Sequence, residues 1–182
     1  MRTSAEWASF FVAGVFMSNR SELLRRAHEY CEKNELLLGN SLGSGVHGSV
    51  FAIESQAEEG SLAIKVHERE RDYCRERDVY LRLSELEVAE IRGCAVPEMT
   101  RWDDALWVIE MTVVTRPFVL DFGGAYLDEP PDFPDDVLAE WRAEKKEQFG
   151  PHWPEVQAIL RFLEGYGIFM EDVNPGNISF GD

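Results

Sequence analysis

A run of three glycines constrains the fold of this chain more than any other feature. Gly43, Gly45 and Gly48 stand in Gly-Ser-Gly-Val-His-Gly-Ser-Val, which fits the pattern G-x-G-x-x-G-x-V at every position. Glycine has no Cβ, so the backbone of such a run can approach a ligand closely and turn its amide groups toward phosphate oxygens. The apolar run after Gly48 is typical of a strand, whereas a dinucleotide-binding turn would open a helix there. We predict a hairpin that covers a nucleoside triphosphate; the alternative is an ordinary flexible turn between two strands.

A lysine in the next apolar run points to the same ligand. Lys65 lies in Leu-Ala-Ile-Lys-Val, and burying an unpaired ammonium group is costly, so we expect it to be paired or bound to an anion. The segment over residues 69–86 is rich in helix formers, and Glu76 is the carboxylate that its apolar face surrounds. We therefore predict an ion pair between Lys65 and Glu76. The alternative is that Glu76 is a solvated residue of a charged helix.

A second motif lies far downstream, where Asp172 is followed five residues later by Asn177. At this spacing in a phosphoryl-transfer site, the Asp accepts the proton of the attacking hydroxyl and the Asn supplies a neutral oxygen to Mg²⁺. The intervening Val-Asn-Pro-Gly is also compatible with a simple turn, because Asn, Pro and Gly are turn formers. The glycine run upstream favours the catalytic interpretation.

Taken together, these motifs resemble the protein-kinase-like superfamily over about Leu36 to Phe180. The loop around Asp172 is especially similar to that of bacterial small-molecule kinases of the aminoglycoside-phosphotransferase type. The resemblance implies an α+β, two-lobe fold with a five-stranded antiparallel N-lobe sheet, one N-lobe helix and a reduced helical C-lobe. It implies a single domain over 1–182: a helical extension over 1–34, an N-lobe over 35–112 and a C-lobe over 113–182 that ends just after the catalytic loop.

The same resemblance assigns roles to individual residues and implies ATP and Mg²⁺ as cofactors. The catalytic residues would be Asp172 and Lys65, with Lys65 holding the α- and β-phosphates and pairing with Glu76. Asn177 would be a metal ligand. The phosphates would be covered by Gly43, Ser44, Gly45 and Gly48. The adenine ring would pack on Val50 and Ala63 and be flanked by Ile109, and its edge would bond to the backbone of Glu110 and Thr112.

The chain also departs from the family pattern. Met170-Glu171 replaces the usual His-Arg before the catalytic Asp, and Asn174 stands where a basic residue is often found. No Asp-Phe-Gly follows the catalytic loop, although that motif would carry a second metal ligand. Asp121-Phe122-Gly123 precedes the loop, so we interpret it as coincidence. Asp182 could stand in for the missing ligand.

Three functions remain open at this point. The first is an ATP-dependent phosphotransferase that moves the γ-phosphate to a hydroxyl acceptor. The second is a catalytically impaired pseudokinase or a nucleotide-binding interaction module, which the loss of a metal ligand would favour. The third is a fragment whose continuation would contain an Asp-Phe-Gly.

Charge narrows the range of partners. The net charge of −16 argues against binding nucleic acid or an anionic membrane. Residues 117–141 contain seven acidic and no basic side chains, so we expect a cationic or neutral acceptor. Three cysteines without paired spacing predict free thiols and a cytoplasmic protein. Trp7 to Met17 is apolar but too short to cross a bilayer, and we expect a buried helix or a true start at Met17.

The apolar patterns also predict most secondary structure. We expect helices over about Ser21–Asn34, Arg69–Leu86, Asp135–Gln148 and Pro154–Leu163, and an irregular segment over Pro117–Pro134. The expected strands are Leu36–Leu42, Ser49–Ile53, Leu62–Val66, Glu98–Trp102 and Ala105–Met111.

Overall fold

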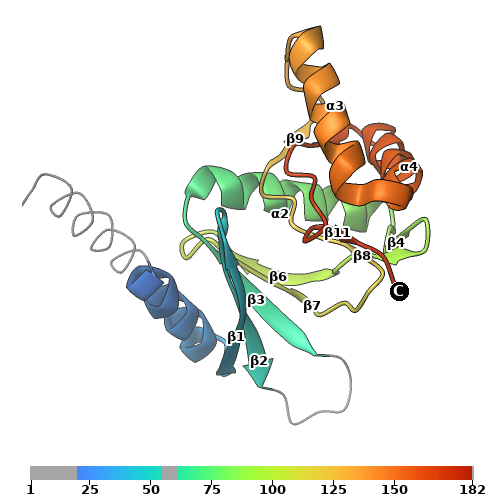
Figure 1. The fold of residues 1–182 in the computed structure, drawn as a ribbon. Coiled ribbons are helices and arrows are strands. Elements are labelled where there is room, and N and C mark those ends of the chain that lie inside the picture. Colours follow the sequence, from blue (N-terminus) through green and yellow to red (C-terminus); the bar gives the residue numbers. More distant parts are fainter. Residues whose placement is uncertain (1–19, 55–60, 182) are drawn as a thin grey trace, which may run out of the picture.

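The computed structural model describes residues 20–54 and 61–181, and its largest element is a five-stranded antiparallel sheet (Figure 1). Its strands, in spatial order, are β1 (Leu37–Gly45), β2 (Gly48–Glu54), β3 (Leu62–His67), β7 (Val108–Thr112) and β6 (Met99–Asp103). Every neighbouring pair is antiparallel. The α+β class and the five-stranded antiparallel sheet therefore agree with the sequence prediction.

A helix over residues 20–33 packs its apolar side on one face of this sheet. Leu23, Ala27 and Tyr30 recur at helical spacing and are buried in one cluster with apolar side chains of β2, β3 and β7. The buried Arg26 of this helix donates to the backbone carbonyls of Leu106 (3.1 Å) and His67 (2.8 Å). The helix is thus tied to the sheet by both apolar contact and charge-assisted hydrogen bonds.

The helix α2 (Glu70–Glu85) packs on the opposite face of the sheet. Its buried Tyr73, Val79, Tyr80 and Leu83 join one cluster with Ile109 and Met111 of β7. Cross-strand partners share a face, and Lys65 is opposite Ile109, so Lys65 also points toward α2.

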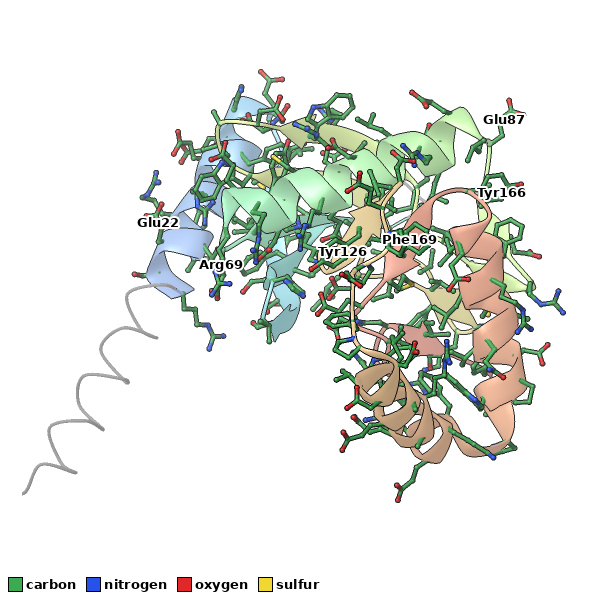
Figure 2. The ribbon with its side chains drawn as sticks, turned by 90° about the horizontal axis from the view of Figure 1, so that it is seen from above. Glu22, Arg69, Glu87, Tyr126, Tyr166 and Phe169 are labelled. Atoms are coloured by element: carbon green, nitrogen blue, oxygen red, sulfur yellow. The ribbon has the colours of Figure 1, made fainter. Side chains whose placement is uncertain are left out.

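The remainder of the chain forms short strands and two further helices. These elements are β4 (Glu90–Ile91), β5 (Cys94–Ala95), β8 (Phe118–Val119), β9 (Ala125–Leu127), α3 (Asp135–Phe149), a 3₁₀ turn (Gly150–His152), α4 (Trp153–Glu164), β10 (Ile168–Met170) and β11 (Ile178–Ser179). β9 pairs antiparallel with β10, and β8 pairs antiparallel with β11 and parallel with β5. Buried residues of α4, β8, β10 and β11 join the cluster under α2 and make one continuous core. Figure 2 shows this part beside α2, with Tyr126 and Phe169 of the β9–β10 pair next to that helix.

Two sequence predictions of secondary structure are corrected. Pro117–Pro134, expected to be irregular, contains β8 and β9, which are too short to show a periodic pattern. The strand expected to start at Ala105 starts at Val108. The reason is a turn, because Asp103 Oδ1 accepts hydrogen bonds from the backbone amides of Ala105 (2.9 Å) and Leu106 (3.1 Å).

Other predictions hold or fall outside the described residues. The predicted helices over 69–86, 135–148 and 154–163 are present as α2, α3 and α4. The three cysteines are free, as expected. Trp7–Met17 and Asp182 lie outside the described residues. Among the helices that the structure describes, none is long and apolar enough to cross a membrane.

Candidate functional site

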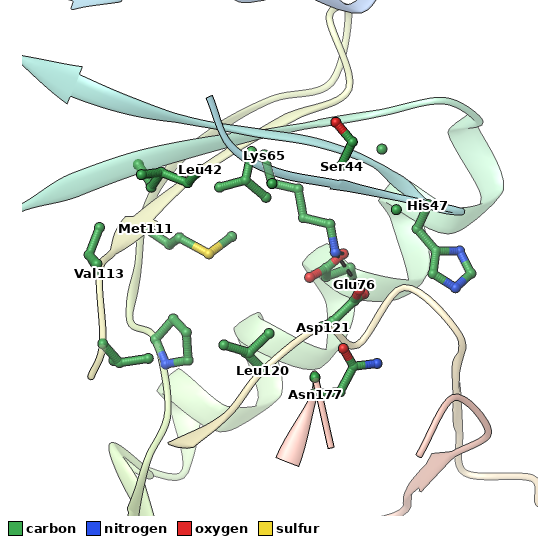
Figure 3. A pocket seen from close by; sticks show the side chains of 18 of the residues that line it. Leu42, Ser44, His47, Lys65, Glu76, Met111, Val113, Leu120, Asp121 and Asn177 are labelled. Atoms are coloured by element: carbon green, nitrogen blue, oxygen red, sulfur yellow. Dashed lines mark hydrogen bonds and ion pairs between the residues drawn. The ribbon is translucent and has the colours of Figure 1, made fainter. Parts of the chain in front are cut away.

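A cavity of about 550 Å³ lies between the β1–β2 hairpin, α2 and the end of β7 (Figure 3). This volume is within the usual range of small-molecule sites. The lining residues are Leu42, Gly43, Ser44, Gly45, His47, Gly48, Val50, Ala63, Lys65, Glu76, Tyr80, Pro97, Met111, Thr112, Val113, Val114, Leu120, Asp121, Gly176 and Asn177. The cavity therefore brings residues of the glycine hairpin together with residues of the downstream loop.

The glycine run forms the hairpin that the sequence predicts, with Gly45 opposite Gly48 at its tip. Gly48 is required by packing, because a Cβ there would lie 2.1 Å from the Val66 carbonyl oxygen. A Cβ on Gly43 or Gly45 would meet nothing within 4 Å. The backbone at Gly43 and Gly45 is thus open on the side where a side chain would stand, which allows close approach by a ligand.

Lys65 forms the predicted ion pair with Glu76, and a second one with Asp121. Its Nζ lies 2.6 Å from Glu76 Oε2 and 2.7 Å from Asp121 Oδ1, and the residue is only 5 % exposed. Burial opposes the charged form, but the attraction of Glu76 and Asp121 outweighs it and raises the pKa of Lys65. Lys65 is therefore a buried, charged ammonium group with one donor left for a ligand.

Glu76 is held by two donors through one oxygen. His67 Nε2 lies 2.7 Å from Glu76 Oε2, the atom that also contacts Lys65, and Glu76 is completely buried. Burial raises the pKa of Glu76, but Lys65 and His67 together lower it below its ordinary value. Its other oxygen, Oε1, has no hydrogen-bond partner among the described residues.

Asp121 belongs to this site, which corrects the interpretation of Asp121-Phe122-Gly123 as coincidence. Besides Lys65, its Oδ1 accepts from the backbone amide of Gly123 at 3.3 Å. Phe122 is fully buried and meets the ring of Tyr80 edge to face, with 5.4 Å between the centroids. The motif was visible in the sequence, but its position before the Asp172 loop counted against it.

The downstream loop holds the carboxylate of Asp172 with two amides. Asn174 Nδ2 donates to Asp172 Oδ1 at 2.9 Å, and Asn177 Nδ2 donates to Asp172 Oδ2 at 3.2 Å. Asn177 Nδ2 also donates to the backbone oxygen of Asp172 at 2.9 Å. Both bonds of Asn177 use its Nδ2, so its Oδ1 is left as an acceptor. The Asn177 side chain lines the cavity.

Two strand pairs bring the Asp121 segment and the Asp172 loop together. The segment around Asp121 connects β8 to β9, and the loop around Asp172 connects β10 to β11. Because β8 pairs with β11 and β9 pairs with β10, the two connections lie at the same end of the pairs. The backbone amide of Leu120 donates to the backbone oxygen of Asn177 at 2.8 Å, and a Cβ on Gly124 would lie 3.5 Å from Asp172 Cβ.

The strand expected to hold adenine is offset from the prediction. Ile109 is fully buried opposite Lys65, and neither Ile109 nor Glu110 lines the cavity. Thr112 does line it, with Met111, Val113 and Val114. On β7 the cavity wall therefore begins at Met111, which is two residues after Ile109 and pairs with Ala63.

The other predicted site residues on the glycine hairpin and β3 all line the cavity: Gly43, Ser44, Gly45, Gly48, Val50, Ala63 and Lys65. His67 is a site residue that sequence reasoning missed, although its place two residues after Lys65 puts it on the same face of the strand. No protein-family model matches this chain, and no curated protein matches it.

Proposed function

We propose that the cavity binds ATP with Mg²⁺ and that the chain is a phosphotransferase of protein-kinase-like architecture. The observation that carries the proposal is the convergence of Lys65, Asp121 and Asn177 on one cavity beneath a glycine hairpin. Phosphoryl transfer needs chiefly positioning and charge neutralisation, and these are the groups that supply both in kinases.

The position of Asp121 favours transfer over the pseudokinase alternative. That alternative relied on a missing Asp-Phe-Gly, which in the resembled family follows the catalytic loop through a pair of strands. Here β11 follows the loop and pairs with β8, which leads into Asp121. The pairing of these two strands supports the proposal that Asp121 serves in place of an Asp-Phe-Gly that follows the loop.

The residues present fit a magnesium ion bound together with phosphates. Within residues 20–54 and 61–181, Asp121 Oδ2 and Asn177 Oδ1 accept no hydrogen bond, and both side chains line the cavity. In the described part of the chain, no cluster of three His, Cys, Asp or Glu residues could hold a metal. Mg²⁺ is commonly held by one or two protein oxygens plus substrate phosphates, where it neutralises charge on the phosphate oxygens.

The transfer step that this geometry supports is a single displacement. The acceptor hydroxyl oxygen forms a bond to the γ-phosphorus, and the bond from that phosphorus to the bridging β–γ oxygen breaks. ADP leaves with the electron pair, and the carboxylate of Asp172 takes the hydroxyl proton. The amides of Asn174 and Asn177 hold this carboxylate in place and keep it oriented.

For the acceptor we propose a cationic or neutral molecule. The acidic residues over 117–141 follow β7, whose end forms part of the cavity wall. Two of them, Asp135 and Asp136, are exposed in the first turn of α3. The negative electrostatic potential of these residues raises the local concentration of cations, an effect that salt screens over about 10 Å at 0.1 M.

The test is a calorimetric titration of ATP with and without Mg²⁺, followed by an assay for ADP release. We expect Mg²⁺-dependent binding that Lys65→Met abolishes and Asp121→Asn weakens, whereas Asp172→Asn binds ATP but releases no ADP. Lys33→Met is the matched control, because Lys33 pairs with Asp103 outside the cavity. Folded wild-type protein that binds no ATP contradicts the proposal, and binding without turnover supports the pseudokinase alternative.

A further inference from the structure

His47 is the second basic side chain of the cavity and lies at the tip of the glycine hairpin (Figure 3). Its side chain is 17 % exposed, and its backbone oxygen accepts from the Glu68 amide at 3.1 Å. That bond ties the hairpin tip to the end of β3. The position of the imidazole is therefore set by the fold around it.

The ring of His47 lies against the two glycines that follow Phe122. A Cβ on Gly123 would lie 3.1 Å from His47 Cγ, and a Cβ on Gly124 would lie 3.6 Å from His47 Nε2. The same Cβ on Gly124 would lie 3.5 Å from Asp172 Cβ. Nε2 is thus on the side of the ring that faces the Asp172 loop.

The other ring nitrogen faces α2. His47 Nδ1 lies 3.5 Å from Asp72 Oδ2, and it has no hydrogen-bond partner in the described part of the chain. Asp72 is buried, and its Oδ2 is the oxygen that faces this nitrogen. The acidic groups that these contacts place around the ring are Asp72 and Glu76 on α2 and Asp172 after β10, since a Cβ on Gly123 would lie 3.3 Å from Glu76 Oε2.

The proposed site lacks positive charge near the end of the triphosphate. Of the lining residues other than His47, Lys65 is the only cation, and it faces the two carboxylates of Glu76 and Asp121. Around Asp172, the positions that are basic in the resembled family hold Met170, Glu171 and Asn174. Asp121 lines the cavity and Asp172 does not, although Asn177, which bonds Asp172, does. A γ-phosphate bound at this end of the cavity would meet the carboxylate of Asp121 and lie near that of Asp172.

We propose that the imidazolium of His47 contacts the γ-phosphate and supplies the positive charge that the Asp172 loop lacks. This inference rests on the proposed function and deepens it. As the bond from the γ-phosphorus to the bridging oxygen breaks and the acceptor oxygen bonds to that phosphorus, His47 Nε2 donates to a γ-phosphate oxygen and keeps its proton. Because Gly123 and Gly124 have no Cβ, they leave the space that the His47 ring occupies.

The experiment compares the affinities for Mg²⁺-bound ADP and for a Mg²⁺-bound non-hydrolysable ATP analogue. His47→Gln should weaken binding of the ATP analogue by about tenfold to a hundredfold, as expected for a lost charge-assisted hydrogen bond, and leave ADP affinity unchanged. His47→Arg, which keeps a positive charge, should restore most of the preference for ATP. His28→Gln is the matched control, because His28 is exposed on the helix over residues 20–33.

Each outcome decides the inference. If His47→Gln weakens both nucleotides equally or neither, or if His47→Arg behaves like His47→Gln, His47 does not contact the γ-phosphate. If folded wild-type protein binds neither nucleotide, the proposed function fails, and this inference fails with it. Thermal melts of each variant establish that binding is compared between folded proteins.

Discussion

Two buried glutamates lie on opposite faces of the same sheet and differ in how many of their carboxylate oxygens are hydrogen-bonded. Glu110 faces the helix over residues 20–33, and both of its oxygens are bonded: Oε2 by Tyr30 (3.1 Å) and Oε1 by Thr100 (2.7 Å) and Arg101 (3.0 Å). Glu76 faces the cavity, and its partners crowd onto Oε2 while Oε1 has none within the described ranges.

The difference distinguishes Glu110, whose carboxylate is fully bonded within the structure, from Glu76, whose carboxylate lines the cavity. Leaving a buried polar atom unpaired costs about 1–3 kcal/mol, so folded proteins usually pair such atoms. Glu110 meets that rule with both of its oxygens, and Glu76 does not. Incomplete pairing beside an open cavity is consistent with a place for a ligand, and the comparison can be tested from both sides.

The largest expected effect is on the structural side. Glu110→Ala should lower the free energy of unfolding by about 3 kcal/mol, because Tyr30 loses its acceptor, Thr100 keeps only the Glu110 backbone oxygen at 3.3 Å, and Arg101 loses its carboxylate. Urea denaturation measures this loss, with the exposed Glu144→Ala as a control. A loss below about 1 kcal/mol would show that the Glu110 network is not structural.

The second effect is on the cavity side. Glu76→Gln should reduce ADP release by about tenfold to a hundredfold, because Lys65 and His67 lose their shared charged acceptor. Its free energy of unfolding should change less than that of Glu110→Ala, since Lys65 keeps Asp121. Unchanged turnover together with a larger loss of stability would reverse the roles assigned to the two glutamates.

A third prediction concerns the stability of the folded protein at low pH. The pKa of Glu76 is lowered in the folded protein, so the unfolded chain binds a proton at a higher pH than the folded chain does. The contribution of Glu76 is therefore complete above about pH 4.3 and is lost as pH falls through the folded pKa, by about 1.4 kcal/mol for each unit of lowering. Glu76→Gln should show a smaller loss of stability on acidification than wild type. Equal slopes in the two proteins would contradict this.

The smallest effect is expected at Tyr30. Tyr30→Phe removes one hydrogen bond to Glu110 and should cost about 1 kcal/mol of stability. Nucleotide affinity should not change, because Tyr30 lies on the face of the sheet away from the cavity. A weaker affinity for ATP in this variant would indicate that the two faces are coupled.

The sequence predicted those features that depend on neighbouring residues. The hairpin, the strand with Lys65 and the helix with Glu76 follow from local patterns, and so their ion pair could be predicted. Asp121 could not be placed, because its position depends on the pairing of β8 with β11, strands that are two residues long. The start of β7 was predicted too early because the turn at Asp103 is held by side-chain bonds, which leave no periodic signal.

The pairing of β8 with β11 also has a consequence for how the protein acquires its site. The two strands are separated along the chain by β9, α3, α4 and β10, so Asp121 and Asn177 meet only after a long loop closes. Contacts of such wide separation form slowly, because the entropy of loop closure is lost before any contact compensates for it. The hairpin and the strand with Lys65 can form from local contacts, whereas the pair of Asp121 and Asn177 is expected to assemble late. A chain still emerging from the ribosome could thus form the glycine hairpin well before the cavity beneath it is complete.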